Sequence, residues 1–184
     1  MRIFLAIIVA VVLVVALGMV LIVKRGAGAR EQPTVIEERL GRTLRHFAIP
    51  ASLRIRKNPV PDTPDVIAAG RAHWADHCAV CHANDGSGNT EIGRNLYPRS
   101  PDMRKATTQE LSDGELFAII RDGVRLTGMP AWRGNEADNW KLVRFIRHLP
   151  RITQEEIDEM ERLNPKSPAE MEEMHRENEF LHGH

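Results

Sequence analysis

The sequence predicts an all-α fold: a small helical domain, with an apolar helix before it and an acidic, helical tail after it. Three observations indicate this fold. No segment of the 184 residues alternates apolar and polar side chains as a strand does. Helix-capping residues recur ahead of apolar segments with helical periodicity. Between these segments lie stretches rich in proline or glycine, which are typical of loops.

The N-terminal apolar segment runs from Ile3 to Val23, and Lys24 and Arg25 follow it. Its 21 uncharged residues, at about 1.5 Å each in a helix, would span a hydrocarbon core of about 30 Å. A cleaved signal peptide is the alternative, because residues 27–29 resemble a cleavage site. The apolar region of a signal peptide, however, is typically about 7–15 residues long. We therefore expect residues 1–25 to be an uncleaved transmembrane anchor.

Residues 26–63 are expected to connect the anchor to the domain in two parts. Within residues 31–47, apolar residues recur at helical spacing among charges, which predicts a short amphipathic helix. This helix would lie on the membrane or on the main domain, or form a solvated stalk. Residues 48–64 contain four prolines and are predicted to be an extended linker. The apolar residues of the amphipathic helix are Ile36, Leu40, Leu44 and Phe47.

The main domain is expected at residues 64–150. Thr63 is a suitable N-cap with proline at the first helical position, so a helix is predicted from Pro64 to His77. Residues 83–106 show no sustained periodicity. A loop of this length in a compact domain is usually functional or disordered.

Two further helices complete the domain. Residues 112–115 form a capping box ahead of an apolar face, and Gly123 suits the end of that helix. The last helix is predicted from Glu136 to Leu149, where Pro150 stops it. The side chains expected to face inward are Leu116, Ile119 and Ile120 on the first helix, and Trp140, Val143, Phe145 and Ile146 on the second.

Residues 151–184 form the tail, in which residues 153–156 and 167–170 each begin a short helix. Charge is segregated: residues 24–60 hold nine Lys and Arg against three Asp and Glu, whereas the tail holds four against ten. The basic stretch has almost no aromatic residues, which argues against nucleic acid and suits a position beside anionic lipid. The histidines and methionines of the tail are a candidate copper site, with incidental residues on a mobile tail as the simpler alternative. They are Met171, Met174, His175, His182 and His184.

The only two cysteines of the chain are Cys78 and Cys81, and His82 follows directly. C-x-x-C-H is the attachment sequence for c-type haem. Each thiol adds to a vinyl group of the porphyrin, and the imidazole becomes an axial ligand of the iron. A thioredoxin-like motif would need a βαβ context, and a zinc site would need a second ligand pair. The sequence shows neither of these.

A second axial ligand is expected from a methionine downstream. Met129 lies between Gly128 and Pro130, a glycine that permits close backbone approach and a proline that stiffens the loop. Met103 is the rival, nearer in sequence but without such a frame. We therefore favour Met129.

Residues 64–150 resemble a class I cytochrome c, the monohaem, His/Met-ligated family found in bacteria. The order of helix, C-x-x-C-H, Gly/Pro loop, helices, methionine loop and closing helix is similar. Gly70 and Trp74 stand eight and four positions before Cys78, where the family has the glycine and aromatic at which its first and last helices cross. Residues 127–132 resemble the methionine loop of bacterial members.

The resemblance implies a small all-α class I cytochrome c fold around one covalent haem c. Cys78 and Cys81 would attach the haem, and His82 and Met129 would ligate the iron. The family commonly has a proline whose carbonyl accepts a hydrogen bond from the proximal imidazole. Here Arg94 stands at that place, and Pro98 is a possible substitute. Candidate partners for the haem propionates are Tyr97, Arg99, Arg104, Arg133 and, favoured among them, Trp132.

The resemblance implies a one-electron carrier rather than an enzyme, because two axial ligands leave no position on iron for a small-molecule substrate. Its partners would be redox proteins and the membrane, through residues 3–23, with no role for nucleic acid. The family attaches haem outside the cytoplasm, so the domain is expected on the periplasmic side of the inner membrane. The positive-inside rule alone would predict the opposite side. The alternatives are a fixed haem subunit of a respiratory or dehydrogenase complex, and, less favoured, a haem peroxidase or gas sensor.

Overall fold

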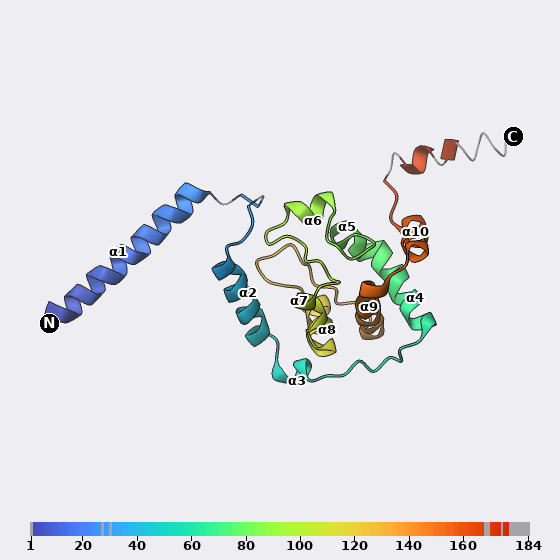
Figure 1. Ribbon diagram of the computed structural model, residues 1–184, viewed down its shortest axis with the longest axis horizontal. Helices are drawn as coiled ribbons and strands as arrows, with labels where there is room; N and C mark the ends of the chain where they lie inside the picture. The colour runs from blue at the N-terminus through green and yellow to red at the C-terminus, as the bar shows by residue number, and fades with distance from the viewer. Residues whose placement is uncertain (1, 27, 30, 168–169, 174, 177–184) are drawn as a thin grey trace.

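The computed structural model describes every residue except 1, 27, 30, 168–169, 174 and 177–184. The described chain is helical and contains no strand, as the sequence predicts. Figure 1 shows one helix projecting away from a compact group of the others. The α-helices are α1 (Arg2–Arg25), α2 (Val35–Ala48), α3 (Ala51–Arg54), α4 (Pro64–His73), α5 (Ala79–His82), α6 (Glu91–Asn95), α7 (Ala106–Gln109), α8 (Asp113–Asp122), α9 (Glu136–His148) and α10 (Gln154–Leu163).

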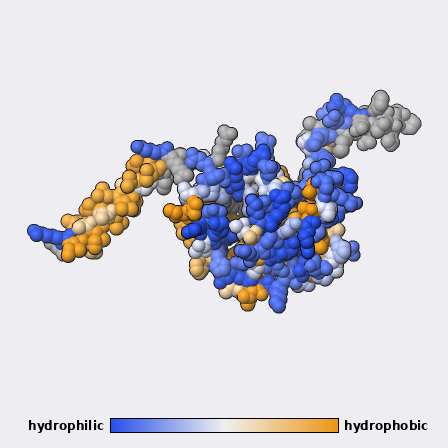
Figure 2. All heavy atoms as spheres, in the orientation of Figure 1, coloured by the Kyte–Doolittle hydropathy of each residue, from blue (hydrophilic) through white to orange (hydrophobic). Residues whose placement is uncertain are grey.

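Among the described side chains of helix α1, the large apolar ones are not covered by the rest of the chain. They are exposed along the helix, and Figure 2 shows α1 as an apolar rod. Within the described residues it is the helix that is long and apolar enough to cross a membrane, over Arg2–Leu21. A surface of this kind is stable where lipid, rather than water, surrounds it.

The core of the domain is built where α4 crosses α9. A Cβ on Gly70 would lie 2.4 Å from the carbonyl oxygen of Lys141 and 3.0 Å from the Cβ of Phe145. Only glycine therefore allows the two backbones to approach this closely. Trp74, one turn later, is 1% exposed and meets the ring of Phe145 edge-on at 5.6 Å. The predicted crossing of the first and last helices of the domain is confirmed.

Helix α8 begins at the predicted capping box. The Ser112 hydroxyl accepts from the Glu115 N–H at 3.1 Å, and the Glu115 carboxylate accepts from the Ser112 N–H at 2.8 Å. The inward face differs from the prediction, because Phe117 is fully buried while Ile119 is only partly so. Phe117 stacks on Trp140 with ring centroids 4.1 Å apart. The helix is covered on a second side that the periodicity did not reveal.

That second cover is the segment 49–60, which we call the strap. The predicted extended linker is extended only in part, because it contains α3, and the strap lies against α8 and α9. The Ser112 hydroxyl donates to the Arg54 carbonyl at 2.6 Å, and the Asn58 amide donates to the Trp140 carbonyl at 2.9 Å. The Arg56 guanidinium lies over the rings of Phe117 and Trp140 at 5.2 and 5.3 Å. These are contacts of a segment fixed on the domain, not of a free tether.

The tail begins with α10, whose predicted capping box at residues 153–156 is present. Met160 of this helix is fully buried against the domain. The Arg71 guanidinium donates to the Glu156 carboxylate at 2.7 Å, which ties α10 to α4. The predicted cap at Ser167 also forms, because its N–H donates to Glu170 at 2.8 Å. Of the candidate copper ligands, Met174, His182 and His184 lie outside the described residues.

Candidate haem-binding site

The C-x-x-C-H motif lies on a helical segment that continues directly from α4. The predicted helix from Pro64 does not stop at His77: five residues, Trp74–Cys78, form a π-helical turn, and α5 follows to His82. A π-turn inside a helix frequently marks a functional site, because the extra residue per turn changes the direction of the side chains that follow. Cys78, Cys81 and His82 are thus presented together from one short stretch of backbone.

His82 is the most distinctive polar residue of the domain. It is 8% exposed, and its Nδ1 is completely buried without a hydrogen-bond partner among the described residues. Burial lowers the pKa of His82 to about 4, so the imidazole is neutral at pH 7. Neutral imidazole is the form that coordinates a metal. A buried, neutral histidine beside two cysteines fits the proximal side of a covalent haem.

The two thiols are also neutral. Burial raises the pKa of Cys78 to about 12, with the neighbouring Cys81 adding to the effect. Burial raises the pKa of Cys81 as well. A catalytic dithiol uses a thiolate, which requires a lowered pKa. The raised pKa values of this pair therefore do not favour a redox-active C-x-x-C, and both thiols remain available for addition to a vinyl group.

The loop after the motif folds back onto it. The Gly88 N–H donates to the His82 carbonyl at 2.8 Å, and the Thr90 hydroxyl donates to the Cys81 carbonyl at 3.4 Å. The carbonyl expected near residues 93–96 does not reach the His82 imidazole. Instead the Gly93 carbonyl accepts from the Ser100 N–H at 3.0 Å. Neither this segment nor Pro98 supplies a hydrogen bond to His82 within the described chain, so packing holds the ring.

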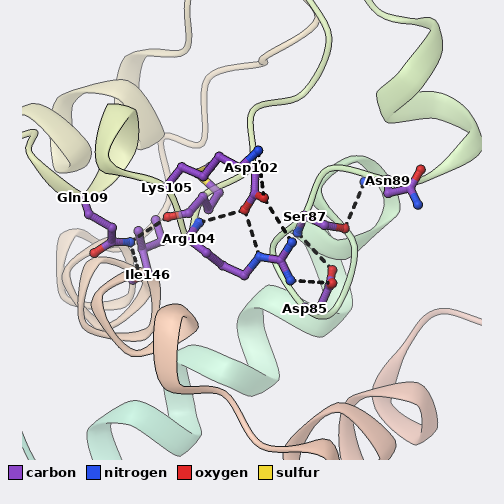
Figure 3. A network of polar contacts seen from close by, with 9 residues as sticks. Asp85, Ser87, Asn89, Asp102, Arg104, Lys105, Gln109 and Ile146 are labelled. Atoms are coloured by element: carbon purple, nitrogen blue, oxygen red, sulfur yellow. Dashed lines mark hydrogen bonds and ion pairs between the residues drawn. The ribbon is translucent and has the colours of Figure 1, made fainter.

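Met103 is partly buried and packs against the core of the domain. Its N–H donates to the Gly86 carbonyl at 2.8 Å, and its carbonyl accepts from Gln109 at 2.6 Å. Its side chain packs against the buried cluster around Phe145. Figure 3 shows the polar network on either side: Arg104 joins Asp102 and Asp85 at 2.9 Å each. Because Arg104 is already paired with these two carboxylates, we expect Arg104 to be a poor partner for a haem propionate.

Met129 lies in a loop whose backbone is held on both sides of the residue. The Met129 N–H donates to the Thr127 hydroxyl at 3.1 Å, and the Met129 carbonyl accepts from the Val124 N–H at 3.1 Å. Gly123, which starts the loop, has a φ of 68°, a conformation that favours glycine. The side chain is only partly buried and is not part of the packed core. It is therefore the freer of the two methionines to serve as a ligand.

Two contacts bring the Met129 loop to the motif. The ring of Trp132 stacks on His77, the residue before Cys78, with centroids 5.1 Å apart and planes at 30°. The loop also meets residues 83–106, because a Cβ on Gly128 would lie 2.6 Å from the Leu96 side chain. Sequence reasoning missed the Trp132–His77 stack, for which the only signal is that each aromatic flanks a predicted ligand segment. Trp132 remains the favoured propionate partner as a prediction.

Residues 65–146 match the protein family described as "Cytochrome C oxidase, cbb3-type, subunit III". The matched region extends from the second residue of α4 to near the end of α9, so it contains both cysteines, His82 and Met129. It coincides with the helices that cross at Gly70 and with the neutral, buried histidine that follows the two thiols. The match supports a monohaem c-type cytochrome domain in this region, and such a domain implies electron transfer through a covalently bound haem c.

Proposed function

We propose that the protein is a membrane-tethered electron carrier on the extracytoplasmic side of a bacterial inner membrane. Cys78 and Cys81 would hold the haem through thioether bonds, and His82 and Met129 would be its two axial ligands. Haem iron with both axial positions filled exchanges single electrons with little rearrangement of its ligands. The observation that carries the proposal is the placement of both thiols and the buried His82 on one continuous helical segment, with no hydrogen-bond partner for the His82 Nδ1 among the described residues.

The assignment of Met129 depends on the contrast between the two loop methionines. The side chain of Met103 already packs against the core, whereas that of Met129 has no such contact and its backbone is held in a tight loop. A neutral thioether favours ferrous iron, so this ligand would raise the midpoint potential relative to a more basic one. The imidazole of His82 would donate electron density to the iron in either oxidation state.

The two methionines provide a matched experiment. In Met129→Ala, we expect a changed visible spectrum of the reduced and oxidised protein and a lowered midpoint potential in a redox titration. In Met103→Ala, we expect both to be retained, with a loss of stability of roughly 2–4 kcal/mol from the lost core packing. An unchanged spectrum and potential in Met129→Ala would overturn the proposed ligation.

The tether is supported by α1, an exposed apolar helix of sufficient length to span a bilayer. After expression in a bacterium that matures cytochromes c, the haem-containing protein should remain in the membrane fraction after a carbonate wash. Its intact mass should include residues 1–25. A soluble product lacking these residues would show that the segment is a cleaved signal and that the tether is wrong.

A second candidate function keeps the same chemistry but changes the role. The matching family is described as a subunit of a cbb3-type oxidase, which favours a fixed haem subunit of a larger respiratory complex. Purification in mild detergent separates the two hypotheses. A carrier should elute alone, whereas a subunit should elute with a constant ratio of other chains.

A further inference from the structure

We propose that α2 lies on the surface of the same bilayer that α1 crosses, with its apolar face in the headgroup region, and thereby holds the haem domain in one orientation. The apolar face of α2 is defined by Ile36, Leu40, Leu44 and Phe47. This inference rests on the proposed anchoring by α1. It adds a second membrane contact that the anchor by itself does not require.

The apolar face of α2 is uncovered along its whole length. Ile36 and Phe47 at its two ends are 79% and 76% exposed, and Leu40 and Leu44 between them are 56% and 59% exposed. Their spacing places all four on one side of the helix. Figure 2 shows apolar side chains gathered over α2 at the edge of the domain. A face of this kind is unstable in water and marks a surface that another apolar phase covers.

The opposite side of α2 is the one that faces the domain. Arg45 is partly buried there, and the His46 Nδ1 lies 3.0 Å from the Glu115 carboxylate of α8. Of the positions that the sequence left open for this helix, packing of its apolar residues on the main domain is therefore not the one observed. The polar side of α2 makes that contact, which directs the apolar face outward.

Chain continuity identifies the bilayer as the covering phase. Nine residues, 26–34, separate the end of α1 from the start of α2, so α2 begins within about 35 Å of the point where α1 leaves the membrane. Figure 1 shows α2 between α1 and the rest of the domain, and turned away from the direction of α1. A helix with an apolar and a polar side in this position is typical of an interfacial helix.

The distribution of charge along the molecule also supports a membrane contact on the α2 side. The segment 24–60 carries nine Lys and Arg against three Asp and Glu, which suits anionic headgroups. The acidic helix α10 lies on the far side of the domain from α1 and α2 (Figure 1). An anionic membrane would therefore attract the α2 side and repel the α10 side.

The strap converts a helix on the membrane into a fixed orientation of the domain. Residues 49–60 follow α2 directly and bind α8 and α9 through hydrogen bonds and through Arg56. Only residues 26–34 then remain as connector between the span and the bound helix. The haem site would face its redox partners at a constant height and angle instead of swinging on a long tether.

Nitroxide labels on single cysteines test the position of α2. The haem-loaded full-length chain is placed in nanodiscs containing anionic lipid, one copy per disc, because haem attachment consumes Cys78 and Cys81 and leaves the new cysteine unique. Labels at Leu40→Cys and Leu44→Cys should collide several-fold more with oxygen, relative to a water-soluble nickel chelate, than the opposite-face control Arg42→Cys. A Val12→Cys label reports the span.

Each other outcome overturns the inference in a distinguishable way. If the labels at positions 40 and 44 are as accessible to nickel as the label at position 42 while the Val12 label is in lipid, α2 is in water. If they are shielded from both reagents, protein rather than lipid covers the face, and at one copy per disc that protein is not a second copy of this chain. If the Val12 label is in water, the anchoring itself fails.

A second readout tests the orientation. Polarised absorption of the haem in aligned bilayers should show a strong angular dependence for the parent chain and for Arg42→Gln. The double variant Leu40→Gln, Leu44→Gln should lose most of it while its haem spectrum in solution is unchanged. An equal angular dependence in the double variant would show that α2 does not orient the domain.

Discussion

The indole Nε1 of Trp74 donates a hydrogen bond to the carbonyl oxygen of Ala83, 3.0 Å away. The same ring lies 5.6 Å from the His82 ring, centroid to centroid. Ala83 has a φ of 62°, an unusual conformation for a residue with a side chain, and it ends the helix that carries the motif. The indole therefore ties the end of that helix to the π-turn that begins at Trp74. It also packs against the imidazole of His82.

We expect Trp74→Phe to be less stable than the parent by about 1 kcal/mol, because the ring packing survives but the Ala83 carbonyl loses its donor. Trp74→Ala should lose roughly 3–5 kcal/mol, since it also leaves a cavity. Denaturant unfolding of the haem-loaded protein measures both. Ala83→Gly in the Trp74→Phe background should restore part of the loss by relieving the positive φ. A Trp74→Phe variant as stable as the parent would contradict this role.

Gly70→Ala should destabilise the domain by about 1–3 kcal/mol, because its Cβ would meet the Lys141 carbonyl and force α4 and α9 apart. Gly41→Ala is the matched control, since nothing lies within 4 Å of a Cβ at that position of α2. There the change should be neutral or stabilising by up to about 1 kcal/mol through helix propensity. Thermal unfolding of the two variants should move in opposite directions. Equal shifts would argue against a close crossing at Gly70.

The Asp102–Arg104 pair should make the loop after the motif sensitive to acid (Figure 3). Its hydrogen bond with Arg104 holds the pKa of Asp102 below its usual range. A lowered folded-state pKa stabilises the fold fully above the unfolded pKa of about 4, and this contribution is lost as pH falls through the folded value.

Asp102→Asn should therefore reduce the free energy of unfolding by roughly 1 kcal/mol at pH 6–7. The difference from the parent should shrink as the pH is lowered below about 4, where the parent carboxylate also becomes protonated. Asp62→Asn, at an exposed position before α4, removes the same charge and serves as the control for the change in net charge. A difference between Asp102→Asn and the parent that stays constant from pH 3 to pH 7 would rule out the ionic contribution.

Met160→Ala should detach or loosen α10 and cost roughly 2–4 kcal/mol, because this side chain is fully buried. Met171→Ala, at a position that is 51% exposed, should change stability by less than about 0.5 kcal/mol. Hydrogen exchange of the amides in residues 154–163 would report the loosening directly. Unchanged protection in Met160→Ala would mean that the polar contacts of α10, with Arg71 and His148, fix the helix without this side chain.

Helix starts were the most predictable part of the fold. The capping boxes at residues 112–115 and 153–156 form as expected, because a cap depends on residues three positions apart. The inward face of α8 was predicted incompletely, since Phe117 is buried by the strap and by α9. Periodicity reports one buried side of a helix, and it cannot reveal a second side that a distant segment covers.

The features of the candidate site likewise fall into those that local sequence predicts and those that depend on the tertiary structure. The sequence by itself determined the C-x-x-C-H motif, the glycine that lets α4 and α9 cross, and the candidate methionines, because each is a property of residue type at a local spacing. Only the tertiary structure decided that Met103 packs against the core, that no described residue bonds the buried Nδ1 of His82, and that Trp132 stacks on His77. Those contacts join residues far apart in the chain. They exist only once the close approach at Gly70 has set how the helices lie against one another.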